Sequence, residues 1–301
     1  MNRINKIVGE LPPGRYDGHV HIFPGKPDSE AYVSRLAAAG FRGGILLSEN
    51  PDPLDDSPAP DPEGAMDRAI EWASASETLY PFYWINPVLD NASDLVDMAV
   101  EKGMFGFKVL PGRFMPGDPK ALPVYEKMAK AGKPVLFHSG ILWDGRPSSK
   151  FTRPGNYEEL IDIPGLRFSC AHISWPWCEE CVAVYGKFLN ALTRVDRPRA
   201  EMFVDITPGT PKLRRRAALE LLFKIGYDVA DRVVFGSDCG ANNYAVEWPV
   251  DWQKTDDAIY AEFGRDTVDP DSVYRRGLQS FLFGGGAAKH CPTPDGTENG
   301  Q

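Results

Sequence analysis

Short apolar runs alternate along the chain with longer segments of helical periodicity. The runs are rich in valine, isoleucine, leucine and phenylalanine, which is typical of parallel strands buried on both faces. Eight strands are predicted, at residues 16–22, 44–48, 80–86, 105–110, 134–138, 166–172, 202–206 and 232–238. Helical patterns occupy residues 28–39, 65–75, 94–102, 121–131, 156–163, 177–192, 212–224, 252–263 and 272–283.

This alternation predicts the fold class. Strands separated by helices form a parallel sheet, and about eight of them select a closed (β/α)8 TIM barrel over an open sheet. One such barrel takes ~250 residues or more, so the 301-residue chain suits a single domain. We expect the barrel domain to span residues 1–283, and residues 284–301, which are rich in glycine, proline and polar side chains, to form a loose tail.

Composition narrows the class of protein. The chain is 43% hydrophobic with a net charge of −9, which disfavours a nucleic-acid or anionic-membrane surface. The first residues lack the apolar segment of a signal peptide, and no apolar run reaches the ~20 residues of a membrane span. Five irregularly spaced cysteines suit reduced thiols. We therefore expect a cytoplasmic protein that acts on a small molecule, and a homo-oligomer is compatible with the sequence.

The strand at residues 16–22 carries the first chemical signal. Side chains at alternate positions of a strand share one face, so His19 and His21 point the same way. Asp17 shares that face and is placed to accept a ring N–H and hold a histidine in one tautomer. Two histidines at this spacing often occur by chance in a core or on a surface. The positions of the remaining histidines therefore decide whether His19 and His21 indicate a metal site.

Further candidate ligands fall at the ends of later strands. His138 ends the fifth strand, His172 the sixth, and Asp238 the eighth. Active sites of (β/α)8 barrels lie at these strand ends, so four of the five histidines are expected to meet at one rim. Alternation also predicts that Gly236 leaves room inside the barrel and that Cys170 shares the inward face of His172.

These residue types suit a catalytic divalent metal. Catalytic zinc keeps about three protein ligands and an open position, and His19, His21 and His138 supply neutral nitrogens. Asp238 can ligate the ion or hydrogen-bond a water, whose pKa a metal lowers to ~7. Asp238 or His172 could then take up a proton and return it to the leaving group.

The same motifs resemble the amidohydrolase superfamily over residues 15–283. The matching pieces are Asp17-Gly18-His19-Val20-His21, Gly106-Phe107-Lys108, Phe137-His138-Ser139, Ala171-His172-Ile173-Ser174-Trp175-Pro176-Trp177 and Phe235-Gly236-Ser237-Asp238. The closest resemblance is to the amidohydrolase-related branch, which contains hydrolases and non-oxidative decarboxylases such as aminocarboxymuconate semialdehyde decarboxylase.

The resemblance implies a metal site and a role for each of its residues. It implies one divalent ion, zinc in preference to manganese, held by His19, His21, His138 and Asp238. It also implies that His172 orients water or substrate, or ligates a second ion. In binuclear members a lysine like Lys108 is carbamylated and bridges two ions, whereas in this branch it can bind a substrate carboxylate or pair with an acidic side chain. We favour one ion.

Loops beyond the strands are expected to supply substrate contacts. Arg113, Trp143, Arg146 and Trp175 are the candidates, and they suit a carboxylated, cyclic substrate. The leading hypothesis is hydrolysis of a C–N or C–O bond, in an amide, ester or lactone. Non-oxidative decarboxylation is the alternative, and a metal- or ligand-binding barrel without turnover ranks third.

Two cysteines invite a separate interpretation. Cys178 and Cys181 have the spacing of a zinc or redox pair. No second pair stands at a suitable spacing, so we expect them to pack on a helix.

Overall fold

The strands form one parallel sheet that closes into a barrel. The computed structural model describes residues 6–53, 58–193 and 199–285, so nearly all of the predicted tail lies outside the described residues. The strand order is β8-β7-β6-β5-β4-β3-β2-β1-β9. β8 (Val233–Val234) and β9 (Cys239–Gly240) are the two ends of the predicted eighth strand. Between them, Gly18 N donates to Phe235 O at 2.8 Å and Asp238 N to His19 O at 2.9 Å, which completes the closure.

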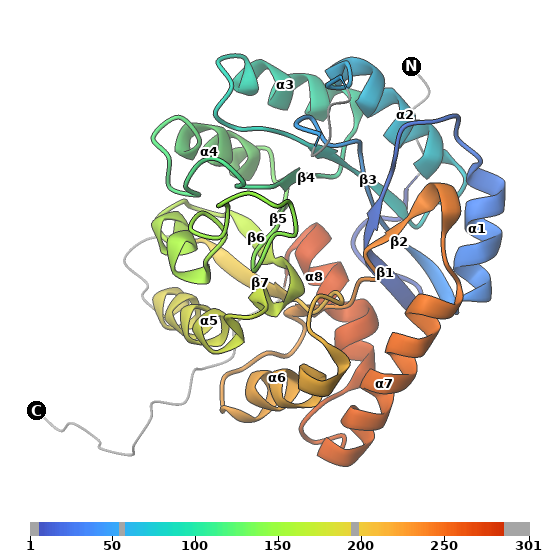
Figure 1. Cartoon of the computed structure of the whole chain (residues 1–301), viewed down its shortest axis with the longest axis vertical. Helices are drawn as coiled ribbons and strands as arrows, with labels where there is room; N and C mark the ends of the chain where they lie inside the picture. Colours follow the sequence, from blue (N-terminus) through green and yellow to red (C-terminus); the bar gives the residue numbers. More distant parts are fainter. Residues whose placement is uncertain (1–5, 54–57, 194–198, 286–301) are drawn as a thin grey trace, which may run out of the picture.

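The remaining elements follow the predicted alternation, and helices surround the strands in Figure 1. The other strands are β1 (Arg15–His21), β2 (Phe41–Leu47), β3 (Leu79–Trp84), β4 (Gly106–Val109), β5 (Val135–Phe137), β6 (Arg167–Cys170) and β7 (Glu201–Asp205). The α-helices are α1 (Ser29–Ala38), α2 (Pro62–Ser74), α3 (Ala92–Lys102), α4 (Leu122–Lys130), α5 (Cys178–Leu192), α6 (Lys212–Lys224), α7 (Glu247–Phe263) and α8 (Gly277–Phe283). The (β/α)8 barrel is confirmed.

Three segments differ from the predicted helices. The segment predicted at 156–163 is a 3-10 helix, η1 (Pro154–Leu160), and the last predicted helix begins with a π-helical turn, η4 (Ser272–Arg276). α7 begins at Glu247, earlier than expected. Short 3-10 turns, η2 (Ala171–Ser174) and η3 (Ala241–Asn243), follow β6 and β9. Asp28 caps the first helix, since its carboxylate accepts from Ala31 N at 3.2 Å.

Hydrophobic cores lie on both sides of the barrel of strands, one outside it and one inside it. The larger core lies between strands and helices and includes Val135 and Phe137, as alternation predicts. The smaller core gathers inward-facing strand residues such as Phe82 and Phe203 around Leu278 and Phe281 of α8. Figure 1 shows α8 lying across the middle of the ring of strands. Since Arg167 at the start of β6 donates to Phe281 O at 3.0 Å, α8 covers the end of the barrel opposite the strand ends that carry the histidines.

The cysteines of α5 are part of the outer core. Cys178 and Cys181 are buried free thiols, and burial raises their pKa values to about 11 and about 12. Protonated, buried thiols support packing over a redox or zinc role. In the described ranges, none of the helices combines the length and the apolar character that a membrane span requires.

A buried ion pair joins α6 to α7. Arg215 and Asp256 are both fully buried, and the guanidinium forms two hydrogen bonds to the carboxylate, at 2.8 and 2.7 Å. A second pair joins the same helices at the surface, between Arg216 and Glu262 at 3.1 Å. Removing one partner of a buried pair leaves an uncompensated charge, whereas an exposed pair is screened by water.

We predict that Asp256→Ala lowers the free energy of unfolding by about 3–5 kcal/mol. The matched control, Glu262→Ala, breaks the exposed pair between the same helices and should lower it by about 1 kcal/mol or less. Urea denaturation followed by circular dichroism measures both values. Equal losses in the two variants would contradict the assignment of a stabilising role to the buried pair.

Candidate metal centre and cavity

A β-bulge in β1 makes the Asp17 side chain point away from the side of the strand that His19 faces. Asp17 pairs with Gly44 and Val20 with Leu46, so three steps along β1 match two along β2. The Asp17 carboxylate accepts from Ser237 N at 2.8 Å, from Tyr244 OH at 2.7 Å and from His19 N at 3.2 Å. The prediction that Asp17 holds a histidine ring is therefore wrong. Asp17 instead fastens β1 to the loop that carries Asp238.

Asp205, at the end of β7, contacts the His19 ring, as Asp17 was predicted to do. Its Oδ2 lies 2.8 Å from His19 Nδ1, and Thr207 N donates to its Oδ1 at 2.6 Å. Because an ionised carboxylate only accepts, we assign the ring proton to Nδ1, which leaves the lone pair of Nε2 for another group. Asp205 was not among the predicted site residues, although an acid near the end of the predicted strand at 202–206 was a usable signal.

Gly236 makes this hydrogen bond sterically feasible. A Cβ on Gly236 would lie 2.4 Å from His19 Cβ and 2.3 Å from Thr207 Oγ1. The predicted room inside the barrel is thus confirmed, and the space is occupied by His19. Gly209 has a similar relation to His172, since its Cβ would lie 2.9 Å from His172 Cβ.

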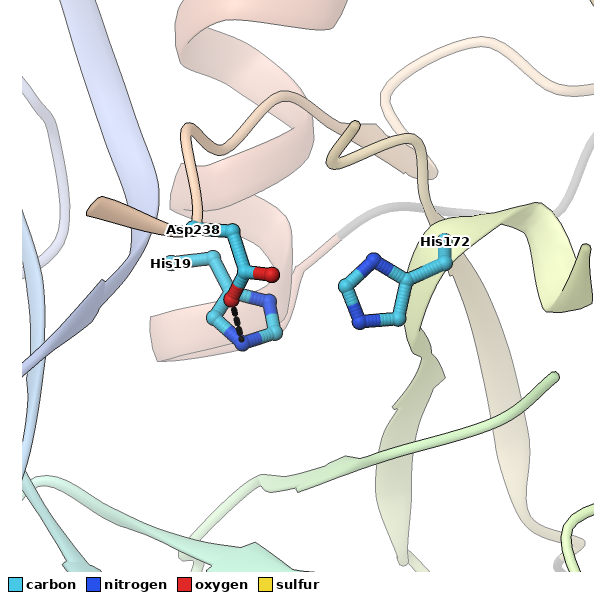
Figure 2. A group of neighbouring side chains, drawn as sticks. All are labelled: His19, His172 and Asp238. Carbon is cyan, nitrogen blue, oxygen red and sulfur yellow. Dashed lines mark ion pairs between the residues drawn. The ribbon is translucent and has the colours of Figure 1, made fainter. Parts of the chain in front are cut away.

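The structure brings three of the candidate residues into one tight cluster, which includes His172 but not the predicted ligands His21 and His138. His19, His172 and Asp238 each offer one ligand atom, and these atoms lie within 4.8 Å of one another. Figure 2 shows the His172 ring facing His19 and Asp238 from the opposite side. His21 Nε2 lies 3.1 Å from Asp238 Oδ1, and the His138 ring lies 5.2 Å from the His172 ring. All four histidines and Asp238 therefore share one opening, as the strand ends predicted.

The electrostatics of the cluster favour neutral rings at His19 and His138 and an ionised carboxylate at Asp238. Burial, followed by the charge of Lys108, lowers the pKa of His19 to about 4. Burial also lowers the pKa of His138 well below its ordinary value. Burial raises the pKa of Asp238, but the hydrogen bond from His21 and the charges of the other histidines outweigh it and hold that pKa well below the usual range. Neutral nitrogens and an ionised oxygen are the forms that bind a cation.

Lys108, on β4, brings a buried positive charge to the cluster. Its Nζ lies 3.3 Å from His19 Nε2 and 5.7 Å from the centre of the Trp84 ring. Burial lowers its pKa to about 8, against the opposing effect of Asp238 and Asp205. In the described part of the chain, no ion pair joins Lys108 to a carboxylate. An anion that enters the cavity can therefore pair with it.

Two of the site residues have an uncommon backbone conformation. His172 and Asp238 both have φ of 61°, in the left-handed region that favours glycine. The turn at His172 follows directly on β6 and ends the alternation of that strand. Cys170 therefore packs in the outer core, and the prediction that it shares the inward face of His172 is wrong. Conformations of this kind cost about 1–3 kcal/mol each and concentrate at functional sites.

The cluster lies on the wall of a cavity of about 1100 Å³. Of the predicted substrate contacts, Lys108, Trp143 and Trp175 line this cavity, and Trp143 is 83% exposed. Arg113 and Arg146 do not line it. They line an adjoining pocket of about 30 Å³, which has room for about one water. Sequence analysis missed Phe23, Trp84, Glu49 and Arg68, which also line the large cavity.

The residues present fit a divalent metal ion. Two buried ring nitrogens, His138 Nε2 and His172 Nδ1, have no hydrogen-bond partner among the described residues. Unsatisfied buried nitrogens are costly unless they meet a ligand or an ion. Three or four imidazoles with one carboxylate form the donor set that zinc and similar ions prefer.

Comparisons with known proteins identify related sequences and folds. A family model described as amidohydrolase matches residues 3–275. A search of curated proteins found no match. The chain is similar to 2,6-dihydroxybenzoate decarboxylase from Rhizobium, with 15% identity, a TM-score of 0.58 and coverage of 89% of this chain and 98% of that one. It is also similar to dihydroorotase from Campylobacter jejuni, with 19% identity, a TM-score of 0.52 and coverage of 89% and 80%.

A third similar structure contains a metal. It is an amidohydrolase from Burkholderia multivorans with bound zinc, with 10% identity, a TM-score of 0.57 and coverage of 89% of this chain and 98% of that one. At these identities the solved structures support the barrel fold, whereas the family model supports the relationship by sequence.

We predict that Asp205→Asn lowers the affinity for zinc by about 10- to 100-fold, because the amide no longer fixes the Nδ1–H tautomer of His19. Competition with a chromophoric chelator measures the affinity. Asp17→Asn is the matched control, since Asp17 is equally buried and contacts the backbone N–H of His19 but no imidazole ring. A larger loss of zinc affinity in Asp17→Asn than in Asp205→Asn would refute the role given to Asp205.

Proposed function

The chain belongs to the amidohydrolase family, whose members are enzymes that bind a divalent metal, and on that premise we propose that it is a metal-dependent hydrolase. The bond attacked is a C–N or C–O bond, in an amide, ester or lactone, and the substrate is a carboxylated small molecule. The observation that carries the proposal is the convergence of four imidazoles and Asp238 at one opening, with His19 held by Asp205.

His19, His21, His138 and Asp238 are the residues that we propose to hold one ion, zinc in preference to manganese. The unpartnered Nε2 of His138 and the lone pair on His19 Nε2 support this set. A bound ion would supply positive charge that polarises the bond to be broken and lowers the pKa of a water molecule. A second ion would require carbamylation of Lys108, and we propose a single one.

The chain's own groups move the protons. Asp238 is ionised, and His21 and His19 both approach its Oδ1, so Oδ2 is the oxygen that we propose to take a proton from the attacking water. His172 faces Asp238 across the opening, where it can orient the scissile carbonyl or return a proton to the leaving group (Figure 2). The left-handed backbone at both residues supports this interpretation.

Lys108 is the proposed partner of the substrate carboxylate. It is buried, it lines the cavity and it forms no ion pair with a described carboxylate. Arg113 and Arg146 are weaker candidates, because they line the smaller pocket and Arg113 already lies 3.5 Å from Asp52. Trp143 and Trp175 are proposed to form apolar walls.

Non-oxidative decarboxylation is the second candidate function. The observation that favours it is again Lys108, since a carboxylate held there lies next to the imidazoles, where bond cleavage would take place. Both reactions would use the same metal-binding residues and can be separated only by their products.

We predict that His19→Ala/His21→Ala lowers bound metal from about one ion per chain to a small fraction of that, because two ligands are lost. Inductively coupled plasma mass spectrometry of the folded proteins gives the stoichiometry. The control is Cys178→Ser/Cys181→Ser, which removes the alternative metal-binding pair and should keep its metal. Unchanged stoichiometry in the histidine variant, with circular dichroism showing a folded protein, would overturn the ligand assignment.

Products distinguish the two reactions. We expect zinc- or manganese-loaded enzyme to hydrolyse at least one member of a panel of lactones, esters and amides that carry a carboxylate. The same enzyme should release no carbon dioxide from a parallel panel of aromatic carboxylic acids. Chromatography detects the hydrolysis products and headspace analysis detects the gas. Release of carbon dioxide without any hydrolysis would establish the decarboxylase function instead.

A further inference from the structure

The charged side chains around the cavity are divided between two places. Lys108 and Asp238 lie in the imidazole cluster. The other charged lining residues in the described ranges, Glu49 and Arg68, pair with each other. Arg68 Nε lies 2.9 Å from Glu49 Oε1, and Arg68 Nη2 bonds the other carboxylate oxygen. Glu49 is only 4% exposed, and the bidentate pair neutralises its charge together with that of Arg68. Among the described residues that line the cavity away from the cluster, there is no other charged side chain.

The uncharged part of the wall is aromatic and aliphatic. The Trp84 ring lies 5.3 Å from the His21 ring, and the Phe23 ring stacks on His21 at 6.3 Å. The loops after β5 and β6 add Leu142, Trp143 and Trp175. Apolar surface therefore begins directly beside the cluster and continues outward, which suits an extended apolar group.

The volume of the cavity sets a lower limit for the size of the apolar group on the ligand. Pockets for drug-sized ligands are about 300–1,000 Å³, and this cavity is about 1100 Å³. A ligand with a single ring would leave most of the apolar wall in contact with water. A larger apolar body buries more of this surface and gains about 25 cal/mol per Å² of it.

We infer that the substrate is a monoanion with an apolar body larger than one ring, an inference that rests on the proposed function. Its one anionic group lies at Lys108, next to the bond that reacts, and its uncharged body lies against Trp84. Glu49 is the specificity-determining residue. By occupying Arg68, it leaves a second anionic group on the substrate without a partner, and burying an unpaired anion is costly. Without Glu49, the free charge of Arg68 would instead attract a second anion.

The experiment measures binding rather than turnover, so it does not depend on the proposed hydrolysis. Isothermal titration calorimetry compares acetate, benzoate, 2-naphthoate and 2,6-naphthalenedicarboxylate, none of which has a bond to hydrolyse. The full-length protein is used both zinc-loaded and after chelator treatment. We expect 2-naphthoate to bind about tenfold more tightly than benzoate. We expect the dicarboxylate to bind at least about tenfold more weakly than 2-naphthoate.

Substitutions test the assigned residues. Glu49→Gln should tighten binding of the dicarboxylate by about tenfold, because Arg68 becomes available, and should change binding of 2-naphthoate little. Glu180→Gln is the control, since Glu180 pairs with Arg153 through both carboxylate oxygens outside the cavity, in a more exposed position, and should change the binding of neither ligand. Lys108→Met should weaken 2-naphthoate by about tenfold or more. If Glu49→Gln does not fold, Glu49→Met/Arg68→Met removes both charges and should still reject the dicarboxylate.

Three results would overturn the inference. They are equal affinities for benzoate and 2-naphthoate, equal affinities for the mono- and dicarboxylate in the unsubstituted protein, and unchanged dicarboxylate binding in folded Glu49→Gln. The proposed function fails in a different way, through absence of metal or of hydrolysis, while this ranking of ligands can still hold. Conversely, the enzyme could hydrolyse small dicarboxylates while its ligand affinities follow a different order from the one expected. That result would leave the proposed function intact and refute the inferred substrate class.

Discussion

The hydrogen bond from His19 to Asp205 is the interaction on which the rest of the site depends. It joins β1 to β7, which are not neighbours in the sheet, across the position of the eighth strand. The split of that strand into β8 and β9 leaves Gly236 in the gap, and the absence of a side chain there makes room for His19. The same arrangement therefore closes the barrel, orients the His19 ring and sets the direction of its unprotonated Nε2.

The same end of the barrel concentrates polar groups that would be costly elsewhere. Neutral rings at His19 and His138, a buried lysine and an ionised aspartate line the same cavity, and two buried ring nitrogens lack partners among the described residues. The opposite end is filled by α8 and inward-facing aromatic side chains. This division gives the barrel one closed, apolar end that stabilises the fold and one open, polar end where a ligand and an ion can bind.

The distribution of charge over the cavity links architecture to specificity. Glu49 follows β2 and Arg68 lies on α2, so their pairing also connects a strand end to the helix that follows it. Lys108 has no such carboxylate partner in the part of the chain that is described. The Glu49–Arg68 pair neutralises its own charges, whereas buried Lys108 brings an unpaired positive charge to the cavity wall. Such a wall distinguishes ligands by the number and position of their anionic groups.

The sequence by itself determined the barrel and most members of the site. Alternation of apolar runs with helical patterns is a local property, and within regular strands it correctly oriented Val135, Phe137 and the residues of the rim. The alternation predicted side-chain directions wrongly at the places where a strand was irregular or ended. The bulge at Asp17 turned that side chain away from the histidines, and the left-handed turn at His172 separated it from Cys170.

Only the tertiary structure decided which groups are partners. Asp205 with His19, and Glu49 with Arg68, are contacts between elements that the fold brings together, and no periodicity encodes them. The physical reason is that strand and helix patterns record which face of an element is buried, whereas a hydrogen bond or ion pair depends on the distance between two elements after the barrel has closed.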